Sequence, residues 1–336
     1  MKILYVEDQI TRNISRISRL FDKYLTKNAK KTLQELEKDE YPPEPDEIKK
    51  IVETSNLIEM EYRFPQALQK IIQHPENYAL FIIDRNLFEE EGYDAEEVKA
   101  IDPSFTEEKY ETYAEREGDY LFSHLVRAGT DVRSKFYFMT AYSAEEGIRG
   151  ASDIQGFINL EIFSKDNFIE KGKDADFDRL KNRIDNIAVL NLQLENRDYL
   201  QILRKNIDEK TADFFLEILS TPNDSPKRIR DNLNRMRLIY ENILTVCAIK
   251  IPNMQSSCGN EKGGSTIIWM KDKGHIDDFV LRNFLFSVRT IANEFGSHKA
   301  YPYTPLYEPT SDTVNALTYA LKDIIRWFGK ICSQYK

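Results

Sequence analysis

Residues 79–86 of the chain read ALFIIDRN, an apolar run that stops abruptly at the carboxylate of Asp84. The same pattern stands near the start of the chain, where the apolar residues 3–6 are followed by Glu7 and Asp8. Short apolar runs bounded by polar residues are typical of strands that are buried on both faces of a parallel sheet. The pattern therefore predicts two central strands, each with acidic side chains at its carboxyl end.

Three further segments extend this pattern. Residues 135–139 begin with Lys135 and continue as an apolar run that ends at Thr140, and a weaker run over residues 157–163 ends near Lys165. In residues 57–62, Ile58, Met60 and Tyr62 alternate with Leu57, Glu59 and Glu61, as side chains do in a strand with one buried face. Segments with helical spacing of apolar residues lie between these runs. Strands that alternate with helices predict an α/β fold with a parallel five-stranded sheet.

The chain changes character near residue 190. Beyond it the strand pattern fades, and long segments with helical periodicity follow one another. We therefore predict an α/β domain over residues 1–190 and an all-α helical bundle domain over residues 191–336. Within the first domain, residues 25–55 and 89–117 exceed the usual length of a connection, and we predict that they are insertions.

The composition narrows the class of protein. Hydrophobic residues make up 41% of the 336, enough for packed cores, and the formal net charge of −9 argues against broad binding of nucleic acid. Three cysteines, an odd number without metal-ligand spacing, favour a reducing compartment. The acidic N-terminal segment does not fit a signal peptide, and no apolar stretch has the length of a membrane span. We expect a cytoplasmic protein with no membrane partner.

The polar residues at the predicted strand ends suit one kind of chemistry. The carboxyl ends of parallel strands meet at one edge of a sheet, so Glu7, Asp8 and Asp84 are expected to converge there. Carboxylates this close repel one another unless a cation lies among them, and Mg²⁺ prefers such oxygen ligands. Asp84 is then placed to attack a phosphoryl group, while Thr140 and Lys165 contact the phosphoryl oxygens.

These segments resemble, in order, the signature strand ends of response-regulator receiver domains. The resemblance covers residues 1–190 and implies a flavodoxin-like doubly wound fold, phosphorylated by a histidine kinase or another phosphodonor of two-component signalling. The order of the motifs is specific, although each piece alone is weak. The segments that carry it are KILYVEDQ (2–9), LIEMEYRFPQALQKI (57–71), ALFIIDRNL (79–87), FYFMTAYS (136–143) and EIFSKDN (161–167).

The resemblance assigns a role to each matching position. It implies that the site binds Mg²⁺ and holds an aspartyl phosphate. By position, Glu7 and Asp8 are the acidic pair, Asp84 is the phosphoacceptor, Asn86 offers its backbone carbonyl to the metal, Thr140 is the switch hydroxyl and Lys165 is the lysine of the pocket.

The sequence departs from the family pattern near that lysine. The switch aromatic of the family stands three residues before the lysine, and here that position is Ile162. Phe163 is adjacent but faces the other way in a strand. Asp166 stands where the family usually has proline, and Gln9 where it has an acid. We therefore expect a signal to leave the site by an unusual route, and residues 89–117 either to cover the site or to change the choice of partner.

The helical half resembles HEPN domains, many of which are RNases. This resemblance is weaker than that of residues 1–190 to receiver domains. Asn293 and His298 fit the motif of that superfamily, but Ala292 stands where its arginine belongs, and Arg289 lies one turn earlier. If the motif is active, His298 acts as general acid or base and Arg289 stabilises a phosphate of RNA. In the alternative interpretation, Gly296 ends the helix and His298 only complements the helix dipole.

Three functional hypotheses follow. The first is a phosphoacceptor signalling protein and not an enzyme, in which phosphorylation of Asp84 changes the packing of the helical output domain or the formation of a homodimer. The second is an RNase of the defence or toxin type, gated by the receiver. The third is a scaffold with a receiver-like fold that is not phosphorylated.

Overall fold

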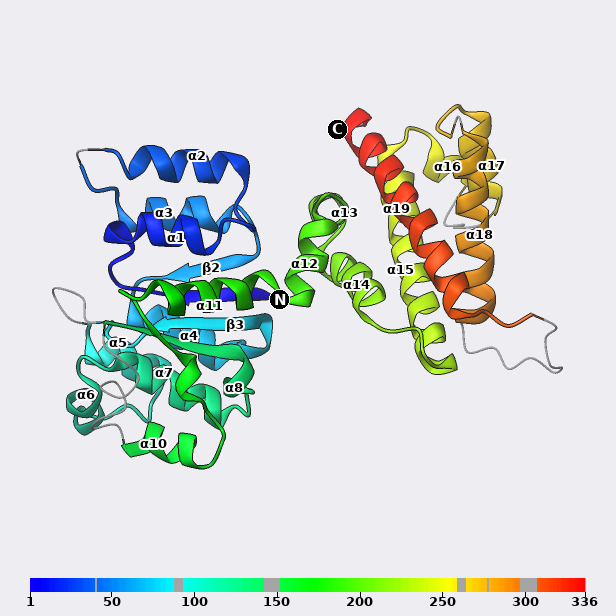
Figure 1. Cartoon of the computed structure of the whole chain (residues 1–336). Coiled ribbons are helices and arrows are strands. Elements are labelled where there is room, and N and C mark those ends of the chain that lie inside the picture. Colours follow the sequence, from blue (N-terminus) through cyan, green and yellow to red (C-terminus); the bar gives the residue numbers. More distant parts are fainter. Residues whose placement is uncertain are drawn as a thin grey trace. The chain divides into compact units, whose positions relative to one another are not determined.

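The computed structural model describes residues 1–39, 41–87, 93–141, 152–258, 264–276, 278–296 and 307–335 (Figure 1). The chain divides into unit 1, Met1–Asn191, and unit 2, Leu192–Lys336, which are treated separately below. No helix in the described ranges combines the length and the apolarity that crossing a membrane requires.

Unit 1 is built on a sheet of five parallel strands. Their order across the sheet is β2-β1-β3-β4-β5, and each neighbouring pair is parallel. The expected α/β fold with a five-stranded parallel sheet is thus confirmed, and the order is compatible with a flavodoxin-like fold. The strands are β1 (Lys2–Val6), β2 (Ile58–Glu61), β3 (Tyr78–Asp84), β4 (Phe136–Thr140) and β5 (Phe168–Glu170).

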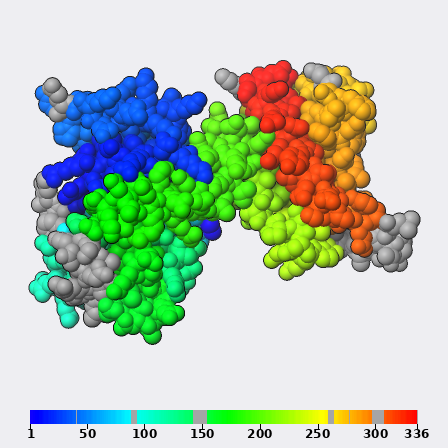
Figure 2. All heavy atoms as spheres, in the orientation of Figure 1, coloured from blue at the N-terminus to red at the C-terminus, as the bar shows by residue number. Residues whose placement is uncertain are grey.

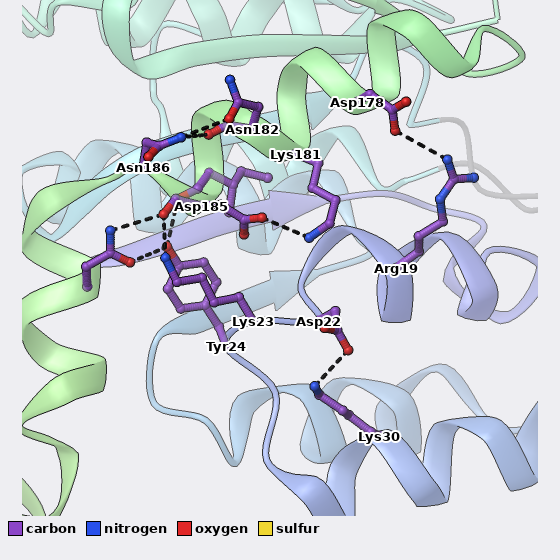
Figure 3. Close-up of polar contacts among 12 residues, drawn as sticks. Arg19, Asp22, Lys23, Tyr24, Lys30, Asp178, Lys181, Asn182, Asp185 and Asn186 are labelled. Carbon is purple, nitrogen blue, oxygen red and sulfur yellow. Dashed lines mark hydrogen bonds and ion pairs between the residues drawn. The ribbon is translucent and has the colours of Figure 1, made fainter.

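The helices α1 (Ile14–Leu20) and α11 (Asp174–Asp185) cover one face of this sheet (Figure 1). Just beyond α1, Phe21 packs edge-on against Tyr5 of β1, with 5.3 Å between the ring centroids. The hydroxyl of Tyr24, four residues beyond the end of α1, donates a 2.7 Å hydrogen bond to the carbonyl of Ile184, so the chain that follows α1 is tied to α11 (Figure 3).

Three other helices cover the opposite face. These are α4 (Phe64–Gln73), α7 (Glu117–Arg127) and α10 (Ser152–Asn159). Their apolar side chains share one buried cluster with the strands, which explains why the strand sequences are continuously apolar. Members of this cluster from the strands are Leu4, Val6, Tyr78, Phe81, Ile83, Phe136, Phe138 and Phe168.

The predicted position of the fifth strand is wrong. Residues 157–163 do not form a strand; their first residues belong to α10, and β5 lies further along the chain at Phe168–Glu170. The apolar residues Ile154, Phe157 and Ile158 have the spacing of a helix that packs on the core, and a short apolar run of this kind resembles a strand in the sequence alone. A strand of three residues is too short to show a period of its own.

The first insertion, residues 25–55, forms the helices α2 (Lys27–Leu36) and α3 (Pro45–Glu53). Helix α3 packs against β2. The carboxylate of Glu53 accepts a 3.0 Å hydrogen bond from the backbone N–H of Met60, a group on the outer side of β2.

The second insertion contributes α5 (Ala95–Ile101) and α6 (Glu107–Tyr113), which pack on α4 and α7. Asp102 accepts a 2.5 Å hydrogen bond from the Tyr120 hydroxyl, and it lies 3.0 Å from Nε2 of His124. In its described part, the insertion is therefore anchored to the helical layer of unit 1. A cluster of aromatic side chains fills the contact: Phe64, Tyr93, Phe105, Tyr110, Tyr113 and Tyr120.

Unit 2 is mostly helical, as expected. Its longest helices are α15 (Pro226–Lys250), α18 (Phe279–Gly296) and α19 (Ser311–Gln334), and each of them packs against the other two. Shorter helices complete the described part of the unit: α12 (Ala188–Glu195), which spans the division between the units, α13 (Arg197–Asn206), α14 (Glu209–Ser220), α16 (Met254–Cys258) and α17 (Gly264–Asp272).

Candidate functional site

The carboxyl edge of the sheet gathers the acidic residues that the sequence places at strand ends. Glu7 and Asp8 follow β1, and Asp84 is the last residue of β3, its neighbour in the sheet. One carboxylate oxygen from each of these three residues lies within 4.8 Å of the other two. Glu7 and Asp84 are buried and Asp8 is half-buried, so the three charges are crowded in a poorly solvated site.

A lysine lies among these carboxylates, and it is Lys171 rather than Lys165. The Lys171 ammonium is 2.9 Å from Oε2 of Glu7 and also pairs with Asp84. Lys171 directly follows β5, whereas Lys165 is exposed in a short 3-10 helix, η3 (Lys165–Asn167), before that strand. The assignment of the pocket lysine to Lys165 fails for the same reason as the predicted strand position.

A signal for Lys171 was present in the sequence. In the receiver domains that the sequence resembles, an aromatic residue stands three positions before the lysine, and Phe168 stands three positions before Lys171. Phe168 is buried and stacks on Phe138 of β4 at a centroid distance of 5.2 Å. Gly172 follows the lysine, so the family's proline is absent in this register too.

The two remaining predicted residues also lie at this edge. Thr140, the last residue of β4, is buried, and its carbonyl accepts a 2.8 Å hydrogen bond from the N–H of Lys171. The backbone N–H of Asn86 donates to Oδ1 of Asp84 at 3.3 Å. Glu7, Asp8, Asp84, Asn86 and Thr140 are thus brought together, and Lys165 is not among them.

The electrostatics of the site favour binding of a divalent cation. Burial, and then the charge of Glu7, raise the pKa of Asp84 well above its usual range, and the same two causes raise the pKa of Asp8 to about 6. Lys171 opposes both shifts, but when all three carboxylates are ionised, its single ammonium compensates only one of their charges. A hard divalent ion with oxygen ligands, such as Mg²⁺, fits this donor set.

A buried hydroxyl at the site supports the same conclusion. Tyr5 is fully buried, and its hydroxyl faces the carboxylate of Glu7 without a hydrogen bond of good geometry within the described residues. Burial raises its pKa, and the charges of Glu7 and Asp84 raise it further, so the hydroxyl lies near the acidic cluster. A buried polar atom without a partner is unusual and points to water or an ion beside it.

Asp84 should therefore destabilise the protein when no cation is bound. Because its folded-state pKa is raised, the stability that its protonated form provides at low pH is lost as the pH rises through that pKa. At neutral pH without Mg²⁺, we expect Asp84→Asn to raise the free energy of unfolding by about 1 kcal/mol or more. Chemical denaturation measures the change.

The exposed Asp166→Asn is the control for that experiment and should change stability by no more than a few tenths of a kcal/mol. A lower stability of Asp84→Asn in Mg²⁺-free buffer would contradict the account of repulsion among the carboxylates.

The segment that follows Asp84 is fixed to the start of α7. Arg85 makes two hydrogen bonds to the carboxylate of Asp119, at 2.7 and 2.8 Å, and both residues are buried. The carbonyl of Arg85 accepts a 3.0 Å hydrogen bond from the N–H of Gly118. The buried Glu117 also accepts from the N–H of Leu87 at 3.1 Å. The loop beside the acceptor is therefore held by backbone and side-chain contacts.

Gly118 leaves no room for a side chain at this contact. A Cβ added there would lie 2.6 Å from the carbonyl oxygen of Asp84 and 2.8 Å from Cα of Arg85, both backbone atoms. We expect Gly118→Ala to destabilise the protein by about 1–3 kcal/mol. Denaturant unfolding, with Gly156→Ala as control, tests this, since a Cβ at Gly156 in α10 meets nothing within 4 Å. Equal stability of the two variants would contradict the close contact.

The described residues include two of the three candidate residues of the helical half. Arg289 and Asn293 both lie on α18, which packs on α15, and the charge of Arg289 acts on the buried Tyr240 of α15. His298 lies outside the described residues. The RNase hypothesis therefore stays a prediction.

Comparison of the chain with protein-family models, with curated proteins and with solved structures found no match.

Proposed function

We propose that unit 1 is a receiver domain of the response-regulator type, with a flavodoxin-like topology and Asp84 as its phosphate acceptor. The observation that carries this proposal is the meeting of Glu7, Asp8, Asp84 and Lys171 at the carboxyl edge of the sheet. Ligands of open α/β sheets bind at that edge, next to the point where the strand order reverses. In the order β2-β1-β3-β4-β5, this point lies between β1 and β3, the strands that bear the three carboxylates.

Asp84 supplies the nucleophile of the proposed reaction. One of its carboxylate oxygens attacks the phosphorus of the donor, and the bond between that phosphorus and the donor's leaving atom breaks. With a phosphohistidine of a histidine kinase, the P–N bond breaks and the imidazole nitrogen keeps the electron pair and takes a proton. The protein acts in this step as a phosphoacceptor of a signalling pathway and not as an enzyme with turnover.

The other residues of the site neutralise charge. Glu7, Asp8, Asp84 and the backbone carbonyl of Asn86 are the groups that would hold Mg²⁺, which supplies positive charge next to the transferring phosphoryl group. Lys171 pairs with the Asp84 carboxylate in the unphosphorylated protein, and its ammonium is placed to contact the phosphoryl oxygens after transfer. The Thr140 hydroxyl is the second donor proposed for those oxygens.

With Lys171 as the lysine of the site, the chain also has the two residues of the family's switch, the Thr140 hydroxyl and an aromatic side chain. With Lys171 in place of Lys165, the aromatic residue three positions earlier is Phe168 and not Ile162. Phe168 packs in the core of unit 1, beside Phe163 at a centroid distance of 5.7 Å. We propose that a signal from Asp84 passes through Thr140 and Phe168, and that it changes the packing of the helical output domain or dimerisation.

Binding of a phosphate mimic tests the acceptor. Beryllium fluoride together with Mg²⁺ is expected to bind to the wild-type protein at a single site, because Asp84 completes its tetrahedral geometry. Asp84→Asn should abolish this binding, and the control Asp166→Asn should leave it unchanged. Fluorine NMR or calorimetry measures both. If wild type and Asp84→Asn bind beryllium fluoride alike, or neither binds, the proposed function is wrong.

A further inference from the structure

A cavity of about 290 Å³ lies next to the acceptor site, on the side of α1 and α11. It is formed by the start of α1 and by the connection between β5 and α11, two segments far apart in the sequence that lie side by side (Figure 2). Lys171 lines this cavity, and its ammonium pairs with Asp84, so one side chain joins the two places. The charged residues of the lining are Arg12, Arg16, Arg19, Lys171, Lys173 and Asp174.

The cavity is therefore strongly basic, but not all of its cations are equally available. Lys171 is committed to Glu7 and Asp84. Arg19 reaches across to α11, where it pairs with Asp178 at 3.4 Å (Figure 3). It also pairs with Asp174 at 3.5 Å. Its guanidinium also lies 4.4 Å from the centre of the Phe177 ring.

Arg16 is different from these two cations. It is half-buried and donates hydrogen bonds only to neutral oxygens, at 2.7 Å to Oδ1 of Asn13 and at 3.4 Å to the carbonyl of Lys171. No carboxylate of the described residues pairs with it. Lys173 has only a weak contact with Asp176, at 3.9 Å, and its side chain is 58% exposed. The cavity thus holds positive charge that the protein does not neutralise.

The size and donors of the cavity indicate its ligand. A volume of about 290 Å³ is at the lower limit of pockets that enclose drug-sized molecules, so the occupant is small. Guanidinium groups present several N–H donors in a plane, a geometry that matches the oxygens of phosphate. A basic pocket also raises the local concentration of anions and their rate of association.

We propose that this basic pocket binds phosphate-type dianions and thereby recruits a small acyl phosphate to Asp84, an inference that rests on the proposed function for the transfer step. The anion is captured by Arg16 and Lys173 and passes to the acceptor beside Lys171. An oxygen of Asp84 then bonds to phosphorus, and the bond from phosphorus to the acyl oxygen breaks. The carboxylate of the donor leaves with the electron pair, so no proton is needed.

Binding of inorganic phosphate tests the pocket without the transfer step. The protein used is Asp84→Asn in Mg²⁺-free buffer, in which the acceptor site does not react. Calorimetry should show that this protein binds phosphate. The double variant Asp84→Asn with Arg16→Gln should bind phosphate about tenfold more weakly or worse, because a charge-assisted hydrogen bond is lost. Lys173→Gln, which leaves the contacts of Lys171 intact, should weaken binding in the same direction.

Arg183→Gln is the matched control. Arg183 is exposed on α11 and, like Arg16, donates to a backbone carbonyl, that of Ser134 at 3.0 Å, but it does not line the cavity. The substitution Arg183→Gln removes the same charge as Arg16→Gln and should leave phosphate binding unchanged. Equal binding by Asp84→Asn with and without Arg16→Gln, or an equal loss with Arg183→Gln, would overturn the pocket.

Phosphorylation of the otherwise unmodified chain by acetyl phosphate with Mg²⁺ provides the second readout. The second-order rate should fall about tenfold with Arg16→Gln and should decrease with rising salt, while Arg183→Gln keeps the wild-type rate. An unchanged rate in Arg16→Gln would overturn the recruiting role. Beryllium fluoride binding separates the two proposals. If the wild-type protein does not bind beryllium fluoride, the receiver assignment fails. Phosphate binding by Asp84→Asn then still tests whether the basic pocket binds anions.

Discussion

Replacement of Lys171 by alanine is expected to lower the free energy of unfolding by about 3–5 kcal/mol in Mg²⁺-free buffer at neutral pH. The substitution removes one partner of a buried charge pair and leaves Glu7 and Asp84 facing each other without an ammonium. Lys165→Ala, at an exposed position, is the control and should change stability by less than about 0.5 kcal/mol.

Two features of this loss identify its cause. Asp84 and Asp8 accept protons readily, since their pKa values are raised, so the cost of losing Lys171 should shrink as the pH falls and these carboxylates become protonated. Added Mg²⁺ should restore part of the stability by the same electrostatic argument. A loss in Lys171→Ala that is independent of both pH and Mg²⁺ would contradict the role of the lysine as counter-charge.

The measurement benefits from the position of the tryptophans. Trp269 and Trp327, the two tryptophans of the chain, both belong to unit 2, so tryptophan fluorescence follows the unfolding of that unit. Circular dichroism follows both units. A denaturation transition that moves in circular dichroism but not in fluorescence is therefore assigned to unit 1, which contains Lys171, Lys165, Arg85 and Asp119.

Breaking the buried pair of Arg85 and Asp119 is the second change with a large expected effect. Arg85→Met is expected to destabilise unit 1 by about 3–5 kcal/mol, because it leaves the carboxylate of Asp119 buried without its bidentate partner. The double variant Arg85→Met with Asp119→Leu should lose less, since both charges are then absent. Denaturation of the single and double variants measures the difference, and a double variant less stable than Arg85→Met would contradict this account.

The same variants test whether the loop after Asp84 depends on α7. Beryllium fluoride and Mg²⁺ should bind more weakly to Arg85→Met than to wild type, because Asp84 and the carbonyl of Asn86 flank the released residue. Arg133→Met, at an exposed arginine in front of β4, is the control and should keep wild-type binding. Unchanged binding in Arg85→Met would show that the acceptor loop is held without α7.

Most of the sheet was predictable from the sequence because its strands are buried on both faces. The runs that end at Glu7, Asp84 and Thr140 are all apolar, and parallel strands bring their ends together whatever the intervening chain does. The fifth strand was not predictable from apolar pattern, since three residues carry no period and α10 offers a stronger apolar run. The wrong prediction that Lys165 is the lysine of the pocket followed directly from the wrong position of that strand.

Other parts of the site depend on contacts that no local pattern encodes. The pairing of Arg85 with Asp119 joins residues 34 positions apart, and the basic pocket joins α1 to residues about 155 positions later in the chain. The insertion helices α5 and α6 begin with recognisable N-cap residues, Asp94 and Thr106, but where they pack is set by the aromatic cluster. These contacts come from the fold and not from any one segment.

The hydrogen bond from Met60 to the side chain of Glu53 has a consequence for self-association. An outermost strand normally offers its N–H and C=O groups to a strand of another molecule. Here α3 packs on β2 and Glu53 occupies one of those N–H groups, so the β2 border of the sheet is closed to strand addition. We therefore expect two copies of this chain that associate through unit 1 to use helical surfaces or the opposite border of the sheet rather than β2.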